Sequence, residues 1–125
     1  MPEPGLRVLI VEDDGDIRLL FEAGLVLRGY TVETAANGHD ALAMLEPGRA
    51  LPSVIVVDLH MPVMDGWQLL TALAKTPRLA SIPAIVLTAA DDPSKRAPRP
   101  PTILTKPVTM EALVAAISAA ARGPA

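Results

Sequence analysis

Cysteine is absent from this chain of 125 residues, and histidine occurs only twice, as His39 and His60. The absence of cysteine excludes disulfide bonds, thiol catalysis and zinc sites built from thiolates. Two isolated histidines also make a poor metal cage. A zinc site is therefore not expected, and any metal that the chain binds should be held by oxygen atoms.

Aromatic residues are scarce as well, since Phe21, Tyr30 and Trp67 are the only three. The core must therefore be built from Val, Ile, Leu and Ala, because half of the residues are hydrophobic. A net charge of -3 gives no reason to expect direct binding to nucleic acid. No apolar run approaches the ~18 residues of a membrane helix, and residues 1–5 lack the features of a signal peptide. We therefore expect a cytoplasmic protein without a membrane segment.

The hydrophobic pattern alternates between strands and helices along the chain. Strict alternation favours a parallel sheet with helices on both faces, and the order 2-1-3-4-5 is common among such doubly wound, flavodoxin-like α/β folds. No repeat or linker divides the sequence, so residues 1–125 are expected to form a single domain without an output domain. The predicted strands are 6–11, 30–36, 54–58, 84–88 and 102–105, and the predicted helices are 16–28, 40–45, 66–75 and 109–121.

Polar side chains stand at the carboxyl ends of four predicted strands, whereas the second strand ends in uncharged residues. In sheets of this order, ligands bind in the crevice beside the first and third strands, at the carboxyl ends. Separate helix caps would have no reason to be distributed in this way. The residues concerned are Glu12 and Asp13 after the first strand, Asp58 at the end of the third, Thr88 at the end of the fourth and Lys106 after the fifth.

Several carboxylates placed close together repel one another and need a neutralising charge. Oxygen ligands without histidine or cysteine select a hard divalent ion, so Mg²⁺ or Mn²⁺ is predicted. Lys106 and Thr88 could hold the oxygens of a phosphoryl group in transfer, a reaction catalysed mainly by positioning and charge neutralisation. Asp58 would then be the nucleophile that becomes an aspartyl phosphate. Asp14, the third acid of its run, is interpreted as the cap of the first helix.

Four motifs resemble those of the receiver domain of two-component response regulators, the CheY-like superfamily. They are the segments 8–14, 57–66, 87–89 and 104–107, which occur in order on successive strand ends and together span almost the whole chain. The resemblance implies a signalling phosphoacceptor domain that is not an enzyme. A sensor histidine kinase or a histidine phosphotransfer protein would supply the phosphate, and the phosphorylation state would control binding of a downstream protein.

The resemblance also implies roles for individual residues around the metal. Asp58 would accept the phosphoryl group, and Asp13 and Asp58 would ligate Mg²⁺ together with the backbone carbonyl of His60. Glu12 would hold the ion through water.

Around the phosphate, the resemblance implies that Thr88 and the backbone amide of Ala89 bind the phosphoryl oxygens. Lys106 would pair with Asp58 before transfer and with the phosphate afterwards. The Lys106-Pro107 peptide bond is expected to be cis, as in the family. Gly66 is predicted to lie in a tight turn that requires a backbone conformation which other residues avoid.

Two features depart from the family pattern. Ile103 stands three residues before Lys106, where family members usually carry Tyr or Phe, so the usual aromatic switch cannot operate. Residues 89–101, where the family has its fourth helix, contain Pro93, Pro98, Pro100 and Pro101. Because proline disfavours helical conformation at the residue before it, we predict that this helix is degenerate or missing, with a merely shortened helix as the alternative.

Two rival functions share part of this pattern. A phosphatase with an aspartate nucleophile usually has a second acid two residues later, where this chain has His60. A receiver-like scaffold that is not phosphorylated usually lacks an acid or the lysine, and both are present here.

Overall fold

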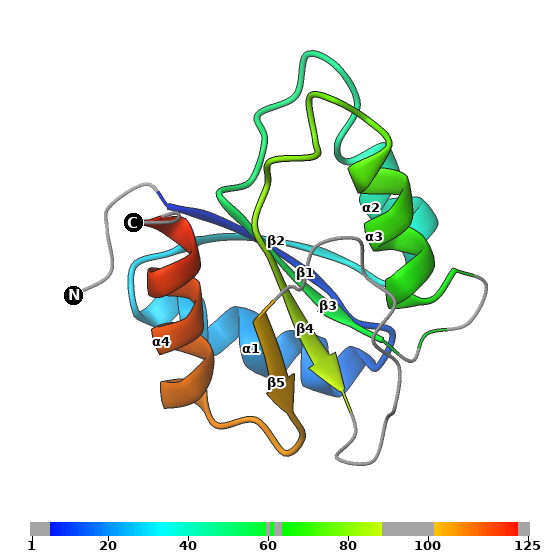
Figure 1. The fold of residues 1–125 in the computed structure, drawn as a ribbon. Coiled ribbons are helices and arrows are strands. Elements are labelled where there is room, and N and C mark those ends of the chain that lie inside the picture. Colours follow the sequence, from blue (N-terminus) through cyan, green and yellow to red (C-terminus); the bar gives the residue numbers. More distant parts are fainter. Residues whose placement is uncertain (1–5, 60, 62–63, 89–101, 123–125) are drawn as a thin grey trace.

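The computed structural model describes residues 6–59, 61, 64–88 and 102–122. Within these residues strands and helices alternate along most of the chain (Figure 1). The elements are β1 (Arg7–Val11), α1 (Gly15–Leu27), β2 (Thr31–Ala35), α2 (Gly38–Ala43), β3 (Val54–Asp58), α3 (Gly66–Ala74), β4 (Ala84–Thr88), β5 (Thr102–Thr105) and α4 (Met110–Ala121).

The five strands form one parallel sheet in the order β2-β1-β3-β4-β5, which confirms the predicted α/β fold and strand order. β1 pairs with both β2 and β3, with Val11 opposite Ala35 on one side and Val57 on the other. The chain therefore winds outward in two directions from β1. This reversal leaves the carboxyl ends of β1 and β3 side by side, where the predicted site lies.

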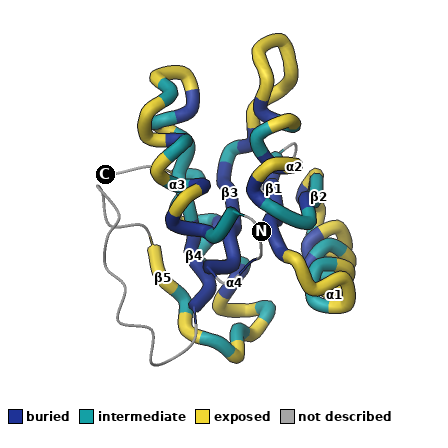
Figure 2. The backbone as a smooth tube through the Cα atoms, turned by 90° about the vertical axis from the view of Figure 1, so that its right-hand side faces the viewer, coloured by how far each residue is buried: buried dark blue, intermediate teal, exposed yellow. Residues whose placement is uncertain are grey.

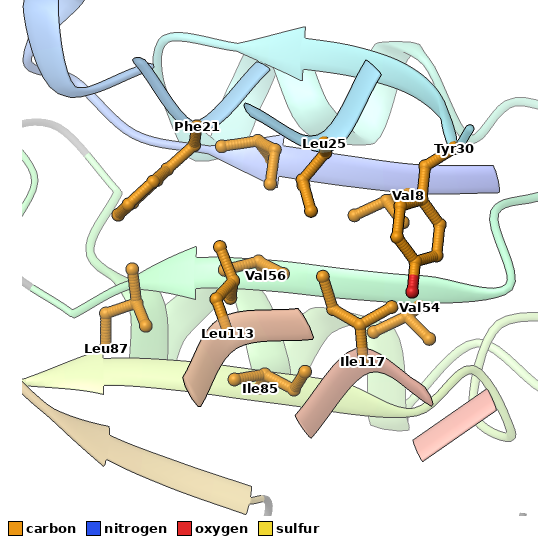
Figure 3. Packing of buried hydrophobic residues seen from close by; sticks show 11 residues of the cluster. Val8, Phe21, Leu25, Tyr30, Val54, Val56, Ile85, Leu87, Leu113 and Ile117 are labelled. Atoms are coloured by element: carbon orange, nitrogen blue, oxygen red, sulfur yellow. The ribbon is translucent and has the colours of Figure 1, made fainter. Parts of the chain in front are cut away.

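Helices cover both faces of the sheet, with α1 and α4 on one face and α2 and α3 on the other (Figure 1). Successive strand residues point to opposite faces, so β1 and β3 each contribute to two separate hydrophobic clusters. On the first face, Val56 of β3 packs among Phe21, Leu25 and Leu113 (Figure 3). Burial on both faces explains why the central strands read as continuous apolar runs.

The first helix begins at Gly15, one residue before the predicted start. Asp14 caps it as predicted, because its side chain accepts hydrogen bonds from the amides of Asp16 and Ile17. Gly29, with φ of 94°, follows its last turn. The second helix was predicted two residues too late. The Asn37 side chain accepts from the amide of Asp40 and so starts α2 at Gly38, a cap that the hydrophobic pattern does not reveal.

The expected loss of the family's fourth helix concerns residues 89–101, which lie outside the described residues. That expectation stays a prediction, and α4 here denotes the helix after β5. Within the described part of the chain, no helix has the length and apolar character needed to cross a membrane.

Candidate functional site

Three carboxylates from two neighbouring strands meet at the carboxyl edge of the sheet. Glu12 and Asp13 directly follow β1, and Asp58 is the last residue of β3. One carboxylate oxygen from each lies within 4.8 Å of the others. The parallel pairing of Val11 with Val57 accounts for this arrangement, because the next residue of each strand falls at the same height. The structure therefore brings together residues separated by more than forty positions in the sequence.

A cation from the far edge of the sheet completes this group. The Nζ atom of Lys106 donates a hydrogen bond to Oδ1 of Asp58 at 3.0 Å. The lysine follows β5, and its backbone amide donates to the carbonyl of Thr88 at 2.8 Å, which fixes the direction in which it leaves the strand. The Lys106-Pro107 peptide bond is cis, as expected from the resemblance. Thr88 is buried at the end of β4, between the strands that carry Asp58 and Lys106.

Glu12 is the most deeply buried of the three acids, with 1% of its surface exposed. Burial raises the pKa of Glu12 to about 7, because desolvation disfavours the charged form. The nearby Asp58 carboxylate raises this pKa further, through charge repulsion and through a hydrogen bond that a protonated Glu12 can donate. The backbone amide of Asp14 and the charge of Lys106 act in the opposite direction.

This donor set fits a hard divalent cation. The Oε1 atom of Glu12 is buried and has no hydrogen-bond partner among the described residues. Two further carboxylates converge on the same point, and one of them, Asp13, is exposed to solvent. Oxygen ligands without nitrogen or sulfur suit Mg²⁺ or Mn²⁺ better than zinc or copper. The residues thus allow a metal to neutralise charges that one lysine balances only in part.

Gly66 lies closer to the site than the sequence indicated. Its φ angle is not in the left-handed region, so the predicted reason for a glycine here was wrong. A Cβ atom at this position would lie 2.8 Å from the carbonyl oxygen of Asp58 and 2.9 Å from Cα of Leu59. Glycine is needed because the start of α3 packs directly on the backbone of β3. Only the packing of two elements reveals this role.

The described residues include most of the predicted site. The structure brings Glu12, Asp13, Asp58 and Lys106 together and places Thr88 at the neighbouring strand end. His60 and Ala89, whose backbone groups were predicted to bind metal and phosphate, lie outside the described residues.

The sequence is similar to those of known response regulators. The family model described as the response regulator receiver domain matches residues 8–118. The transcriptional regulatory protein PrrA of Mycobacterium tuberculosis is 37% identical over 120 residues, which cover 93% of this chain and 50% of that protein. The response regulator MprA of Mycobacterium ulcerans is 36% identical over 121 residues, which cover 94% of this chain and 50% of that protein. The chain thus spans about half the length of these relatives.

Solved structures of receiver domains share the fold. The chemotaxis protein CheY4 of Vibrio cholerae is similar with a TM-score of 0.82 and 32% identity, over 93% of this chain and 98% of that one. The receiver domain of a signal transduction histidine kinase from Syntrophus aciditrophicus has a TM-score of 0.84 and 30% identity, over 95% and 92%. The resemblance noted in the motifs is confirmed, and the chain belongs to the response regulator receiver domain family of two-component signalling.

Proposed function

We propose that Asp58 accepts a phosphoryl group in a reaction that depends on a divalent cation. The observation that carries this proposal is the ion pair of Asp58 with Lys106, beside the carboxylates of Glu12 and Asp13. Only 4% of the Asp58 side chain is exposed, against 35% for Lys106. A buried carboxylate paired with a partly exposed cation is suited to accepting a small, charged group.

The proposed step is attack by a carboxylate oxygen of Asp58 on phosphorus. An O–P bond forms while the bond from phosphorus to the imidazole nitrogen of a donor phosphohistidine breaks, and the leaving imidazole keeps the electron pair and takes up a proton. When bound, Mg²⁺ would neutralise charge on the transferring group. Glu12, Asp13 and Asp58 would hold it, with His60 contributing its backbone carbonyl.

Lys106 and Thr88 would contact the phosphoryl group from the other side. Lys106 donates a hydrogen bond to Oδ1 of Asp58. After transfer, the phosphate would take the place of this oxygen as the partner of the lysine. Thr88 is a residue of the adjacent strand β4 and offers a hydroxyl donor. The backbone amide of Ala89 is assigned the same task by resemblance.

The partners follow from the family. Response regulators receive phosphate from histidine kinases, so a sensor histidine kinase or a histidine phosphotransfer protein is the proposed donor. Several relatives are named as transcriptional regulators. The expectation that no nucleic acid is bound therefore has no support from the relatives. The downstream partner and the cytoplasmic location stay predictions.

The test is intact-mass analysis after incubation with a small phosphodonor, with and without Mg²⁺. We expect one phosphate adduct that requires Mg²⁺ and is lost in Asp58→Asn. Asp14→Asn is the matched control, because Asp14 is a neighbouring acid whose side chain caps α1, and asparagine caps equally well. An adduct of unchanged yield on Asp58→Asn would refute the assignment of Asp58. An adduct formed equally well in the presence of a chelator would refute the role of the metal.

A further inference from the structure

Arg18 makes a contact that the proposed chemistry does not use. It lies in the first turns of α1, and its Nη1 atom donates a hydrogen bond to the backbone carbonyl of Glu12 at 2.8 Å. The side chain is partly buried, and the bond connects the helix back to the point where β1 ends and the acidic run begins. A guanidinium group beside several acids would ordinarily pair with a carboxylate. This one binds a peptide carbonyl instead.

The bond is one of several that hold the backbone on both sides of Asp13. The amide of Glu12 donates to the carbonyl of Ala35 at 3.0 Å, and its carbonyl accepts from Arg18. Oε2 of Glu12 accepts from the amide of Asp14 at 3.1 Å. The peptide planes before and after Asp13 are therefore both held, although Asp13 itself is exposed.

Holding Asp13 in place has an electrostatic cost, because its carboxylate lies within 4.8 Å of those of Glu12 and Asp58. Without a bound cation the three groups repel, and an exposed side chain on a free loop would turn away into water. The charges that act on the pKa of Glu12 are those of Asp58 and Lys106, and Arg18 is not among them. Arg18 thus restrains the loop through a backbone carbonyl, without acting on the charge of Glu12.

We propose that Arg18 is a positioning residue, which preorganises Asp13 for divalent-cation binding by fixing the peptide between Glu12 and Asp13. This inference rests on the proposed function, because it assumes that the three acids hold a cation. The expected effect resembles that of other groups that orient metal ligands from outside, whose loss weakens metal binding by roughly 10- to 100-fold.

The first experiment is a Mg²⁺ titration followed by the fluorescence of Trp67, which is the second residue of α3 and is buried in one cluster with Leu59. We expect Arg18→Ala to raise the dissociation constant at least about tenfold. Removal of a positive charge would by itself tighten cation binding, so weaker binding has to come from lost positioning. Arg18→Lys keeps a donor and the charge, and we expect it to recover part of the affinity.

Arg28→Ala is the matched control. Arg28 caps the other end of the same helix, and its Nη1 atom donates to the carbonyl of Gly24 at 3.0 Å. Its loss should cost a comparable amount of stability in thermal unfolding, while the Mg²⁺ dissociation constant changes by no more than about twofold. Equal weakening in both variants would reduce the role of Arg18 to general helix stability and overturn the proposal.

A measurement without metal separates this inference from the proposed function. In ¹⁵N relaxation of the metal-free protein, the amides of Asp13 and Asp14 should be rigid in the wild type, with order parameters of about 0.85, and should fall toward about 0.6 in Arg18→Ala. Unchanged order parameters together with unchanged Mg²⁺ affinity would overturn the role of Arg18 and leave the proposed function standing. A wild type that shows no response to Mg²⁺ would instead refute the cation site, whatever the relaxation data show.

Discussion

The ion pair of Asp58 and Lys106 joins the end of β3 to the residue after β5, and these two strands lie in opposite surroundings. Every residue of β3 (Val54–Asp58) is buried, whereas β5 (Thr102–Thr105) is largely exposed, as the colouring of Figure 2 shows. β3 lies in the centre of the sheet with a neighbour on each side, and β5 forms its edge. Asp58 is thus held in the buried centre of the sheet and Lys106 at its margin. The ion pair therefore joins a buried acid to a partly exposed base.

The largest effect is expected from truncating the same residue type in both strands. Ile55 of β3 has no exposed surface, while 40% of Ile103 in β5 is exposed. We expect Ile55→Ala to lower the free energy of unfolding by roughly 4 kcal/mol, since it leaves a cavity in a packed core. Ile103→Ala should cost no more than about 1 kcal/mol, because that site can be filled by water. Urea denaturation measures both free energies of unfolding. Equal losses would contradict the difference in packing between β3 and β5.

A second prediction sharpens the comparison at the ion pair itself. Lys106→Met should destabilise the metal-free protein on the order of 2 kcal/mol, because it leaves the buried Asp58 charge beside two other acids without its cation. Asp58→Asn should be neutral or stabilising, since it relieves repulsion and the partly exposed Lys106 can turn to water. Thermal unfolding in the presence of a chelator tests this. If both variants were destabilised to the same extent, the difference in burial between Asp58 and Lys106 would have no effect on stability.

A third prediction concerns pH. The pKa of Glu12 is about 7 in the folded protein and 4.5 as the ordinary value, so between these values the folded state binds more protons than the unfolded state. The free energy of unfolding should therefore fall as pH rises from about 4.5 to about 7, and this contribution should level off above that. Glu12→Gln lacks this titration. We expect its stability, compared with that of the wild type in chelator, to improve with rising pH across this window, and a constant difference would contradict the shifted pKa.

The smallest effect is expected from Ile103→Tyr at the edge strand. The side chain is partly exposed, so the free energy of unfolding should change by about 0.5 kcal/mol or less. Its effect on signalling is a separate question, because this is the position where family members usually carry an aromatic residue. If phosphate-dependent partner binding is the same in both proteins, the position has no part in signalling here.

Local sequence was enough to predict most of the fold. The run 54–57 consists of β-branched residues without alternation of polar and apolar side chains, a pattern typical of a strand covered on both faces. Alternation of such runs with helical periodicity then predicted the parallel sheet, for which 2-1-3-4-5 is a common strand order. The start of α2 was missed because a single side-chain hydrogen bond, from the amide of Asp40 to Asn37, decides it. Capping of this kind leaves little trace in a hydrophobic pattern.

The sequence by itself determined which residues stand at the strand ends, because strand length and polarity are local properties. It therefore predicted Glu12, Asp13, Asp58, Thr88 and Lys106 as candidates. Only the tertiary structure decided how close they come and what surrounds them. The 4.8 Å grouping of the acids follows from the register of β1 against β3, and the raised pKa of Glu12 follows from burial beneath elements distant in sequence. The bond from Arg18 to the Glu12 carbonyl and the need for glycine at position 66 were likewise set by the packing of helices on strand ends, since each depends on distances that no local pattern encodes.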